Sequence, residues 1–159
     1  MRYFSKKIRL FCLTLALLMA FAPSPLAASG FRLNAQEQAM IEMVNSARAR
    51  YGRSALTLDL ELCALAREKS SDMLNNNYFA HESPTLGSAS DLLTANGVSF
   101  RSVGENIARY RSIEHAQAAL LSSDGHRRNL LSRSYTHFGV GVALDENGFV
   151  YVTQLFVRR

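Results

Sequence analysis

Two histidines and one glutamate are the residues of this chain whose types and spacing could do chemistry. They lie in three short segments: Phe79-Ala80-His81-Glu82-Ser83-Pro84, Gly104-Glu105-Asn106-Ile107-Ala108 and Gly125-His126-Arg127-Arg128-Asn129-Leu130-Leu131. Each of the three side chains is close to a residue that favours turns, so all three could point into one cleft. Imidazole nitrogens bind zinc and similar divalent ions, and an imidazole paired with a carboxylate can also transfer protons.

The residues themselves leave the kind of site open. His81 and His126 are the candidate metal ligands, with zinc or another divalent metal as the cofactor. Zinc sites built from only two protein imidazoles are usually weak, and a glutamate that accepts a ring N–H orients the histidine rather than binding the metal. With Glu105 in that orienting role, a histidine could instead act as a base. No serine has a partner that would activate it as a nucleophile, so we assign no catalytic residue.

Residues 1–28 are predicted to be a signal peptide. A positively charged start is followed by the apolar run 10–22 and by small residues at Ala27, Ala28 and Ser29. The apolar run is too short to span a membrane, and Pro23 and Pro25 interrupt the segment that follows it. We therefore expect one domain at 29–159, with no transmembrane segment in the mature chain. The protein is expected to be secreted or held in the cell envelope, either in the periplasm or outside the cell.

The charge of the expected mature domain is close to neutral. The whole chain has 18 lysine and arginine residues against 13 aspartates and glutamates, but four of the basic residues and none of the acids lie in residues 1–28. The remaining excess of one positive charge is too small for a nucleic-acid binder or for a protein held on an anionic membrane by charge alone. Cys63 is the one cysteine outside the predicted leader, so no internal disulfide can form, and we predict that it is buried in a helix.

Four helices are predicted from polar capping residues that precede an apolar helical period. Glu37 completes a capping box for the first helix, Asp91 supports the start of the third, and Gly125 is expected to be the left-handed stop of the fourth. From cap to end, the expected helices are Asn34 to Gly52, Asp59 to about Leu74, Ser88 to Gly97 and Ser112 to about Leu121.

The end of the chain is predicted to be a β-hairpin. Residues 138–144 and 149–157 are separated by Asp145-Glu146-Asn147-Gly148, a polar loop that ends in glycine. The second strand is apolar at nearly every position, which indicates burial on both faces. Helices followed by strands in one compact domain predict an α+β fold, with helices layered around an antiparallel sheet.

Six motifs of this chain, in order, resemble the CAP superfamily (cysteine-rich secretory proteins, antigen 5, pathogenesis-related 1), and above all its small bacterial secreted branch. Together they extend over about residues 36–157. The resemblance implies the three-layer α-β-α sandwich of that superfamily. The motifs are Asn45-Ser46-Ala47-Arg48, the three segments around His81, Glu105 and His126, Phe138-Gly139-Val140-Gly141-Val142, and Tyr151-Val152-Thr153-Gln154-Leu155-Phe156.

The resemblance also implies roles for the three polar side chains. His81 and His126 correspond to the two cavity histidines, and Glu105 to the carboxylate between them. Many eukaryotic members have a second acid shortly before the second histidine, and Ser123 occupies that position here. A hydroxyl cannot replace a carboxylate as a charged base or hard metal ligand, although the adjacent Asp124 could turn inward.

We therefore expect a secreted CAP-domain protein that acts as a non-enzymatic extracellular or envelope binding module. Its partner would be an unidentified envelope or extracellular protein, a wall component or a lipid ligand, and not a nucleic acid. The alternatives are a metal-assisted hydrolase of the peptidase kind that uses the same cleft, and a carrier of a small apolar ligand. The pair Arg127-Arg128 could contact an anionic wall polymer, but two charges alone favour a solvated turn.

Overall fold

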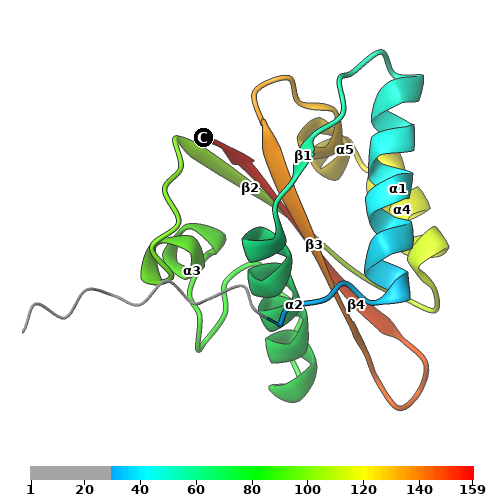
Figure 1. Cartoon of the computed structure of the whole chain (residues 1–159). Coiled ribbons are helices and arrows are strands. Elements are labelled where there is room, and N and C mark those ends of the chain that lie inside the picture. The colour runs from blue at the N-terminus through cyan, green and yellow to red at the C-terminus, as the bar shows by residue number, and fades with distance from the viewer. Residues whose placement is uncertain (1–29) are drawn as a thin grey trace, which may run out of the picture.

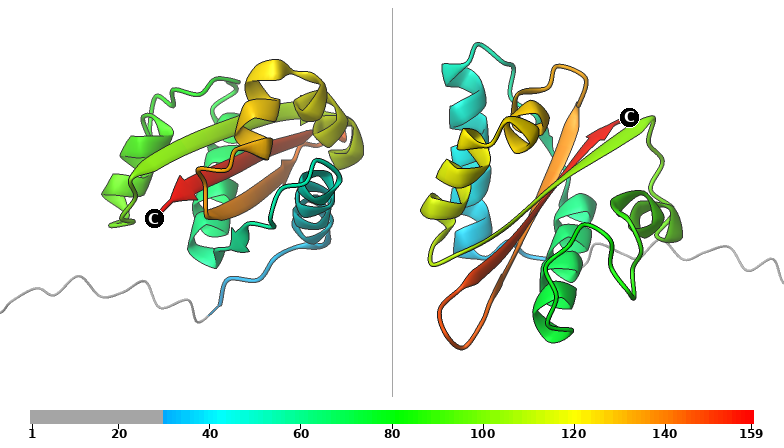
Figure 2. Two further views of the ribbon diagram at one scale, coloured as in Figure 1. Left: turned by 90° about the horizontal axis from the view of Figure 1, so that it is seen from above. Right: turned by 180° about the vertical axis from the view of Figure 1, so that it is seen from behind.

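Five helices and four strands form one α-β-α sandwich in the computed structural model, which describes residues 30–159 (Figure 1). The predicted signal peptide, residues 1–28, lies outside the described residues. One sheet of order β1-β3-β4-β2 separates two helix layers, with α2 and α3 on one face and α1, α4 and α5 on the other (Figure 2). The expected α+β class and three-layer sandwich are therefore confirmed.

The elements follow one another with short connections. Strand β1 pairs parallel with β3, whereas β4 pairs antiparallel with both β3 and β2. In chain order they are α1 (Ala35–Arg50), β1 (Thr57–Leu58), α2 (Leu60–Asn75), α3 (Ala89–Ala95), β2 (Ser102–Tyr110), α4 (Ile113–Ser122), α5 (Asp124–Leu131), β3 (His137–Leu144) and β4 (Val150–Arg158).

Helix starts and the final hairpin follow local sequence signals. The side chains of Asn34, Asp59, Ser88 and Ser112 each accept a hydrogen bond from a backbone N–H in the first turn of the helix that follows. The hairpin of β3 and β4 closes at Gly148, whose φ of 80° suits a residue without a side chain. The four predicted caps and the predicted hairpin are confirmed.

The expected left-handed stop at Gly125 is wrong. Helix α4 ends at Ser122, and Ser123, with an extended backbone (φ −87°, ψ 124°), separates it from α5. Gly125 lies inside α5, and it is absent from the positive-φ glycines among residues 30–159. The chain changes direction at Ser123 instead, and the second helix that results carries His126.

Strand β2 has no counterpart among the predicted elements. Gly104, Glu105 and Asn106 interrupt the apolar alternation that would have indicated a strand. The segment is nevertheless paired along its whole length with β4, from Ser102 opposite Arg158 to its last residue. As the outermost strand of the sheet, β2 has one side free to meet residues from both helix layers.

Both faces of the sheet are buried, which explains the apolar sequence of β4. Val152 and Phe156 pack in the core under α1 and α4, whereas Leu155 and Val157 pack under α2 and α3. Cys63 is fully buried in α2, as predicted, and burial raises the pKa of its thiol to about 11. Within the described residues no helix has the length and apolar character needed to cross a membrane.

Helix α2 lies directly on strand β3 because two glycines leave room for it. A Cβ atom on Gly139 would overlap backbone atoms of Leu62, and one on Gly141 would overlap backbone atoms of Arg67. One turn further along α2, Ser70 Oγ donates to the Gly141 carbonyl oxygen at 3.0 Å. Helix and strand therefore meet backbone to backbone, with no side chain between them.

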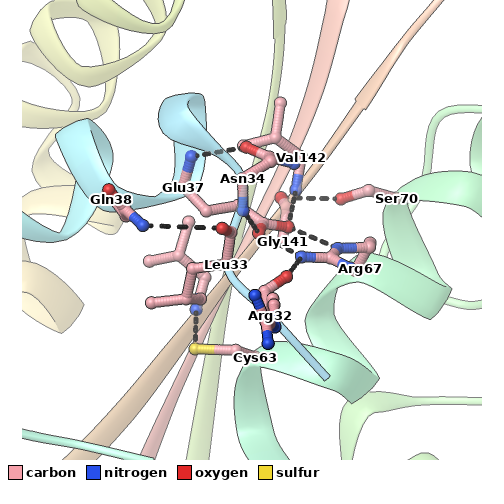
Figure 3. Close-up of polar contacts among 11 residues, drawn as sticks. Arg32, Leu33, Asn34, Glu37, Gln38, Cys63, Arg67, Ser70, Gly141 and Val142 are labelled. Atoms are coloured by element: carbon pink, nitrogen blue, oxygen red, sulfur yellow. Dashed lines mark hydrogen bonds and ion pairs between the residues drawn. The ribbon is translucent and has the colours of Figure 1, made fainter. Parts of the chain in front are cut away.

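A buried carboxylate joins α1 to α2 and β3 (Figure 3). Glu37 is fully buried and accepts hydrogen bonds from Arg67 Nε at 2.7 Å and from the backbone N–H of Val142 at 3.3 Å. Its second oxygen accepts from the backbone N–H of Asn34 at 2.9 Å, which closes the capping box of α1. Because this charge is removed from water, loss of Arg67 would leave it unpaired at a large cost.

The close approach of α2 to β3 predicts that Gly141→Ala is severely destabilising. The added methyl group meets helix backbone, which cannot rotate away, so we expect a loss of about 3 kcal/mol of unfolding free energy or more. Gly125→Ala is the matched control, because a Cβ there has its nearest neighbour 4.0 Å away at Arg128 Nη2. Urea denaturation measures both, and a Gly141→Ala variant as stable as the control would contradict this packing.

Candidate functional site

The candidate site begins at Glu105, on the outer strand of the sheet. In β2 it lies opposite Leu155 of β4, so its side chain is on the face covered by α2. The side chain is 6% exposed. Burial raises the pKa of Glu105, although a hydrogen bond from His81 and the positive charge of Lys69 act in the opposite direction. Its Oε2 atom is buried without a hydrogen-bond partner within residues 30–159.

His81 is held by this carboxylate. Its Nδ1 lies 2.6 Å from Glu105 Oε1, and because an ionised carboxylate only accepts, Nδ1 carries the proton that is donated. The His81 side chain is 59% exposed, in contrast to its partner. The interaction fixes the tautomer and the tilt of the ring, and leaves Nε2 as the nitrogen that can meet a ligand.

A buried lysine of α2 positions the loop that carries His81. Lys69 is 1% exposed and donates to the His81 carbonyl oxygen at 2.9 Å and to Tyr78 OH at 3.1 Å. Burial lowers its pKa, and the charges of Glu105, Asp72 and Glu82 partly offset that effect. Sequence reasoning missed Lys69, although its spacing of four residues from Leu65 and Met73 put a charge on the apolar stripe of this helix.

Asp72, also missed, holds the rest of the same loop. Its carboxylate accepts hydrogen bonds from Tyr78 OH, from Ser83 Oγ at 2.6 Å and from Thr85 Oγ1 at 2.5 Å. Burial opposes ionisation, yet these bonds and one from Asn76 together hold the pKa of Asp72 below its ordinary value. One rigid helix therefore anchors both sides of the segment that contains His81.

His126 reaches the same edge of β2 from the opposite helix layer. Its carbonyl oxygen accepts from Asn106 Nδ2 at 3.1 Å, which ties α5 to β2. Burial lowers the pKa of His126, and the charge of His81 lowers it further. The two imidazoles are therefore close enough to influence each other, one from α5 and the other from the loop after α2. Folded His126 takes up a proton less readily than in the unfolded chain, so acid below pH 6.5 removes stability.

A buried amide network supports the strand behind the site. Asn106 Nδ2 also donates to Gln154 Oε1 at 3.1 Å, and Gln154 Nε2 donates to Gln117 Oε1 at 3.0 Å. Asn129 of α5 donates to Asn106 Oδ1 at 3.0 Å and to the Glu105 carbonyl oxygen at 3.2 Å. Buried amides that are paired in this way fix β2 relative to α4 and α5.

The two other residues proposed for the cleft lie where α4 gives way to α5. Ser123 is half-buried and precedes α5 without a capping hydrogen bond from its side chain. The side chain of Asp124 is 78% exposed and forms an ion pair with Arg127. Neither forms a hydrogen bond with His81 or Glu105. Asp124 is paired with Arg127 instead, so it does not replace the second acid of the eukaryotic members.

The residues present fit a metal ion only weakly. Among residues 30–159 no three histidine, cysteine, aspartate or glutamate side chains are grouped as metal ligands. Glu105 is engaged by His81 Nδ1, which leaves the two imidazoles as the available donors. A zinc ion held there would need water for its remaining positions, and it would supply a polarised water molecule.

A row of aromatic and arginine side chains extends from Phe79 along the paired ends of β2 and β4. Phe79 is 48% exposed and meets the Tyr151 ring edge to face, with 6.5 Å between the ring centres. The guanidinium of Arg109 lies over the rings of both Tyr151 and Phe149, and that of Arg111 lies 4.2 Å from the centre of the Phe149 ring. We call these five residues the aromatic row. It was not predicted, because its members come from three separate segments of the chain.

Comparison with known proteins points to one family. The family model described as CAP, the cysteine-rich secretory protein family, matches residues 41–156. The uncharacterized protein YkwD of Bacillus subtilis is 40% identical over 128 residues, which are 80% of this chain and 49% of YkwD. The uncharacterized membrane protein YlbC of the same organism is 40% identical over 124 residues, which are 77% of this chain and 34% of YlbC.

A solved structure agrees with these relatives. An extracellular protein of Bacillus anthracis that contains an SCP domain is 34% identical, with a TM-score of 0.70 over 82% of this chain and 45% of that protein. This chain therefore spans less than half the length of each of the three relatives.

The proximity of the two imidazoles predicts how His126 titrates. In an NMR titration between about pH 5 and 8, we expect its midpoint below 6.5. The midpoint should rise part of the way in His81→Asn, because the nearby charge is removed while burial remains. His115→Asn, which changes an exposed histidine of α4, is the control and should leave His126 unaffected. An unchanged His126 midpoint in His81→Asn would show that the two rings are far apart.

Proposed function

Since this chain belongs to the CAP family, whose model matches residues 41–156, we propose that it is an exported binding module that recognises its partner at the outer edge of β2. Export is supported by the predicted signal peptide at residues 1–28. It is also supported by the description of the Bacillus anthracis relative as an extracellular protein.

The observation that carries this proposal is the fixed, exposed ring of His81. Its Nδ1 lies 2.6 Å from Glu105 Oε1, and the His81 side chain is 59% exposed, two residues along the chain from the exposed Phe79. A histidine held in this way can donate to or accept from a partner without losing rotational freedom on binding. Among the hydrogen bonds of the described residues, none joins a serine, threonine or cysteine side chain to His81 or His126, which favours binding over nucleophilic catalysis.

The aromatic row favours a protein as the partner. Aromatic and arginine side chains are enriched at the centres of protein interfaces, where they supply large contact areas at low entropic cost. Phe79 and Arg109, which are exposed, offer such a set over the buried ring of Tyr151. Stacking restricts the arginines before a partner arrives, so little further ordering is needed. We therefore infer a surface or extracellular protein that docks along β2 and β4.

Capture from the envelope and culture medium of the producing organism tests this proposal. Immobilised protein should retain one partner, and Phe79→Ser or His81→Ala should weaken that binding about tenfold or more. Leu144→Ser is the matched control, because Leu144 is 56% exposed but lies outside the row. Binding of the identified partner is then measured with purified components by calorimetry. Equal retention by all variants would overturn the proposed surface.

A metal-assisted hydrolase is the second candidate, favoured by the mutual proximity of the two imidazoles. Zinc titration by calorimetry, with the double variant His81→Ala/His126→Ala as control, measures whether these rings bind a metal. Our proposal predicts weak or absent zinc binding, and no turnover of a panel of peptides and esters with zinc present. Turnover that disappears in the double variant would establish the hydrolase and replace the binding module.

A further inference from the structure

A second polar surface lies where the chain leaves α1 and where it enters β3. The two connections run side by side in Figure 1, joined by a hydrogen bond of 3.0 Å from the Thr57 N–H to the Thr136 carbonyl oxygen. Between them is an open hollow of about 550 Å³, which we call the arginine groove. Its lining residues are Arg48, Gly52, Arg53, Ser54, Ala55, Thr57, Arg133, Tyr135 and Thr136.

The groove concentrates positive charge that no carboxylate neutralises. Within residues 30–159, neither Arg48, Arg53 nor Arg133 forms an ion pair. Arg48 is 3% exposed, and its hydrogen bonds go only to carbonyl oxygens, including that of Leu130 at 2.7 Å. Burial lowers the pKa of Arg48, as does the charge of Arg53. Guanidinium groups remain protonated in spite of such effects, so like charges are held close together here.

A neighbouring hollow continues the same surface. It measures about 290 Å³, shares Arg53 with the arginine groove, and is also lined by Asp124, Arg127, Arg128 and Leu131. Asp124 is paired with Arg127, which leaves Arg128 without a carboxylate partner in the described chain. Asp59, two residues after the lining residue Thr57, is paired with Arg159. Two adjoining hollows with five arginines and one acid form a track that is longer than a single small anion.

Hydroxyl groups complete the lining. The described residues give no hydrogen-bond partner to Ser54 Oγ or Thr57 Oγ1, so both hydroxyls can donate to a ligand oxygen. The Tyr135 hydroxyl lies against Gly104 of β2, and burial raises its pKa. The Tyr135 ring is stacked on Phe156 with 5.8 Å between ring centres, and this stacking occupies one of its faces. Guanidinium and hydroxyl donors without an open aromatic platform favour repeated oxyanions over nucleic-acid bases.

We propose that the arginine groove and the adjoining hollow bind a polyanionic chain that carries repeated phosphate or carboxylate groups. Planar guanidinium groups match the two oxygens of either group, and the shared Arg53 connects successive anions along the track. Two charges alone did not indicate anion binding by Arg127-Arg128. The fold places this pair in a surface that contains three more arginines, and the five together support that role. The adjoining hollow borders the candidate site at Asp124, but neither hollow is lined by His81, Glu105 or His126, and this proposal does not depend on the protein partner proposed there.

Binding of two polymers by the full domain tests the proposal. Inorganic polyphosphate and polygalacturonate are compared by calorimetry at two salt concentrations, which shows whether phosphate or carboxylate is preferred; either preference supports the groove. The variant Arg128→Gln/Arg133→Gln changes two exposed side chains and should weaken binding about tenfold for each arginine. The slope of the logarithm of affinity against that of salt concentration should fall by about one for each arginine.

The control variant is Arg32→Gln. Arg32 is exposed and precedes α1, so it lies about 24 Å from the groove end of that 16-residue helix, at 1.5 Å per residue. Thermal unfolding confirms that each variant is folded. Absence of binding or an equal loss in Arg32→Gln would overturn the proposal, because the first indicates no attraction at this surface and the second a general attraction between charges.

Discussion

The contact between helix α2 and strand β3 is the constraint on which the rest of the structure depends. Gly139 and Gly141 remove the side chains that normally separate a helix from a sheet, so the two backbones touch. Backbone atoms cannot adopt other rotamers, and this contact therefore fixes the position of α2 more rigidly than side-chain packing would. The buried Glu37 of α1 accepts hydrogen bonds from Arg67 of α2 and from Val142 of β3, so α1 is held in place by the same two elements.

The position of α2 determines where His81 lies. Lys69 and Asp72, on the same helix, hold the loop after α2 by its carbonyl oxygen and by its hydroxyl groups. Glu105 contacts the ring from β2, and β4 lies between β2 and β3. The distance between the glycine contact and the imidazole is therefore spanned by one rigid helix and two paired strands. A shift of α2 would separate His81 from Glu105 without any change in either residue.

Local chemistry made much of this fold predictable. Caps such as Asn34, Asp59 and Ser88 mark helix starts because a side-chain oxygen satisfies free N–H groups there, and the apolar run of β4 indicates burial on both faces. The site was predicted only in part. Pairing of His81 with Glu105 followed from a resemblance, whereas Lys69, Asp72 and the strand β2 depend on contacts between distant segments. Polar residues of β2 hide its strand character, since pairing with β4 rather than local pattern stabilises it.

Glu105 itself shows why a structural role alone does not explain this edge of the sheet. Burial raises its pKa, and Oε2 has no partner in the described chain, so its charge costs stability near neutral pH. An apolar residue would fill the same place opposite Leu155 without that cost. What the carboxylate supplies instead is a fixed tautomer for an exposed imidazole. Part of this cost is offset because the carboxylate is also a counter-charge for the buried Lys69. The remainder is matched by the orientation of one surface ring, which is the arrangement expected of a binding site.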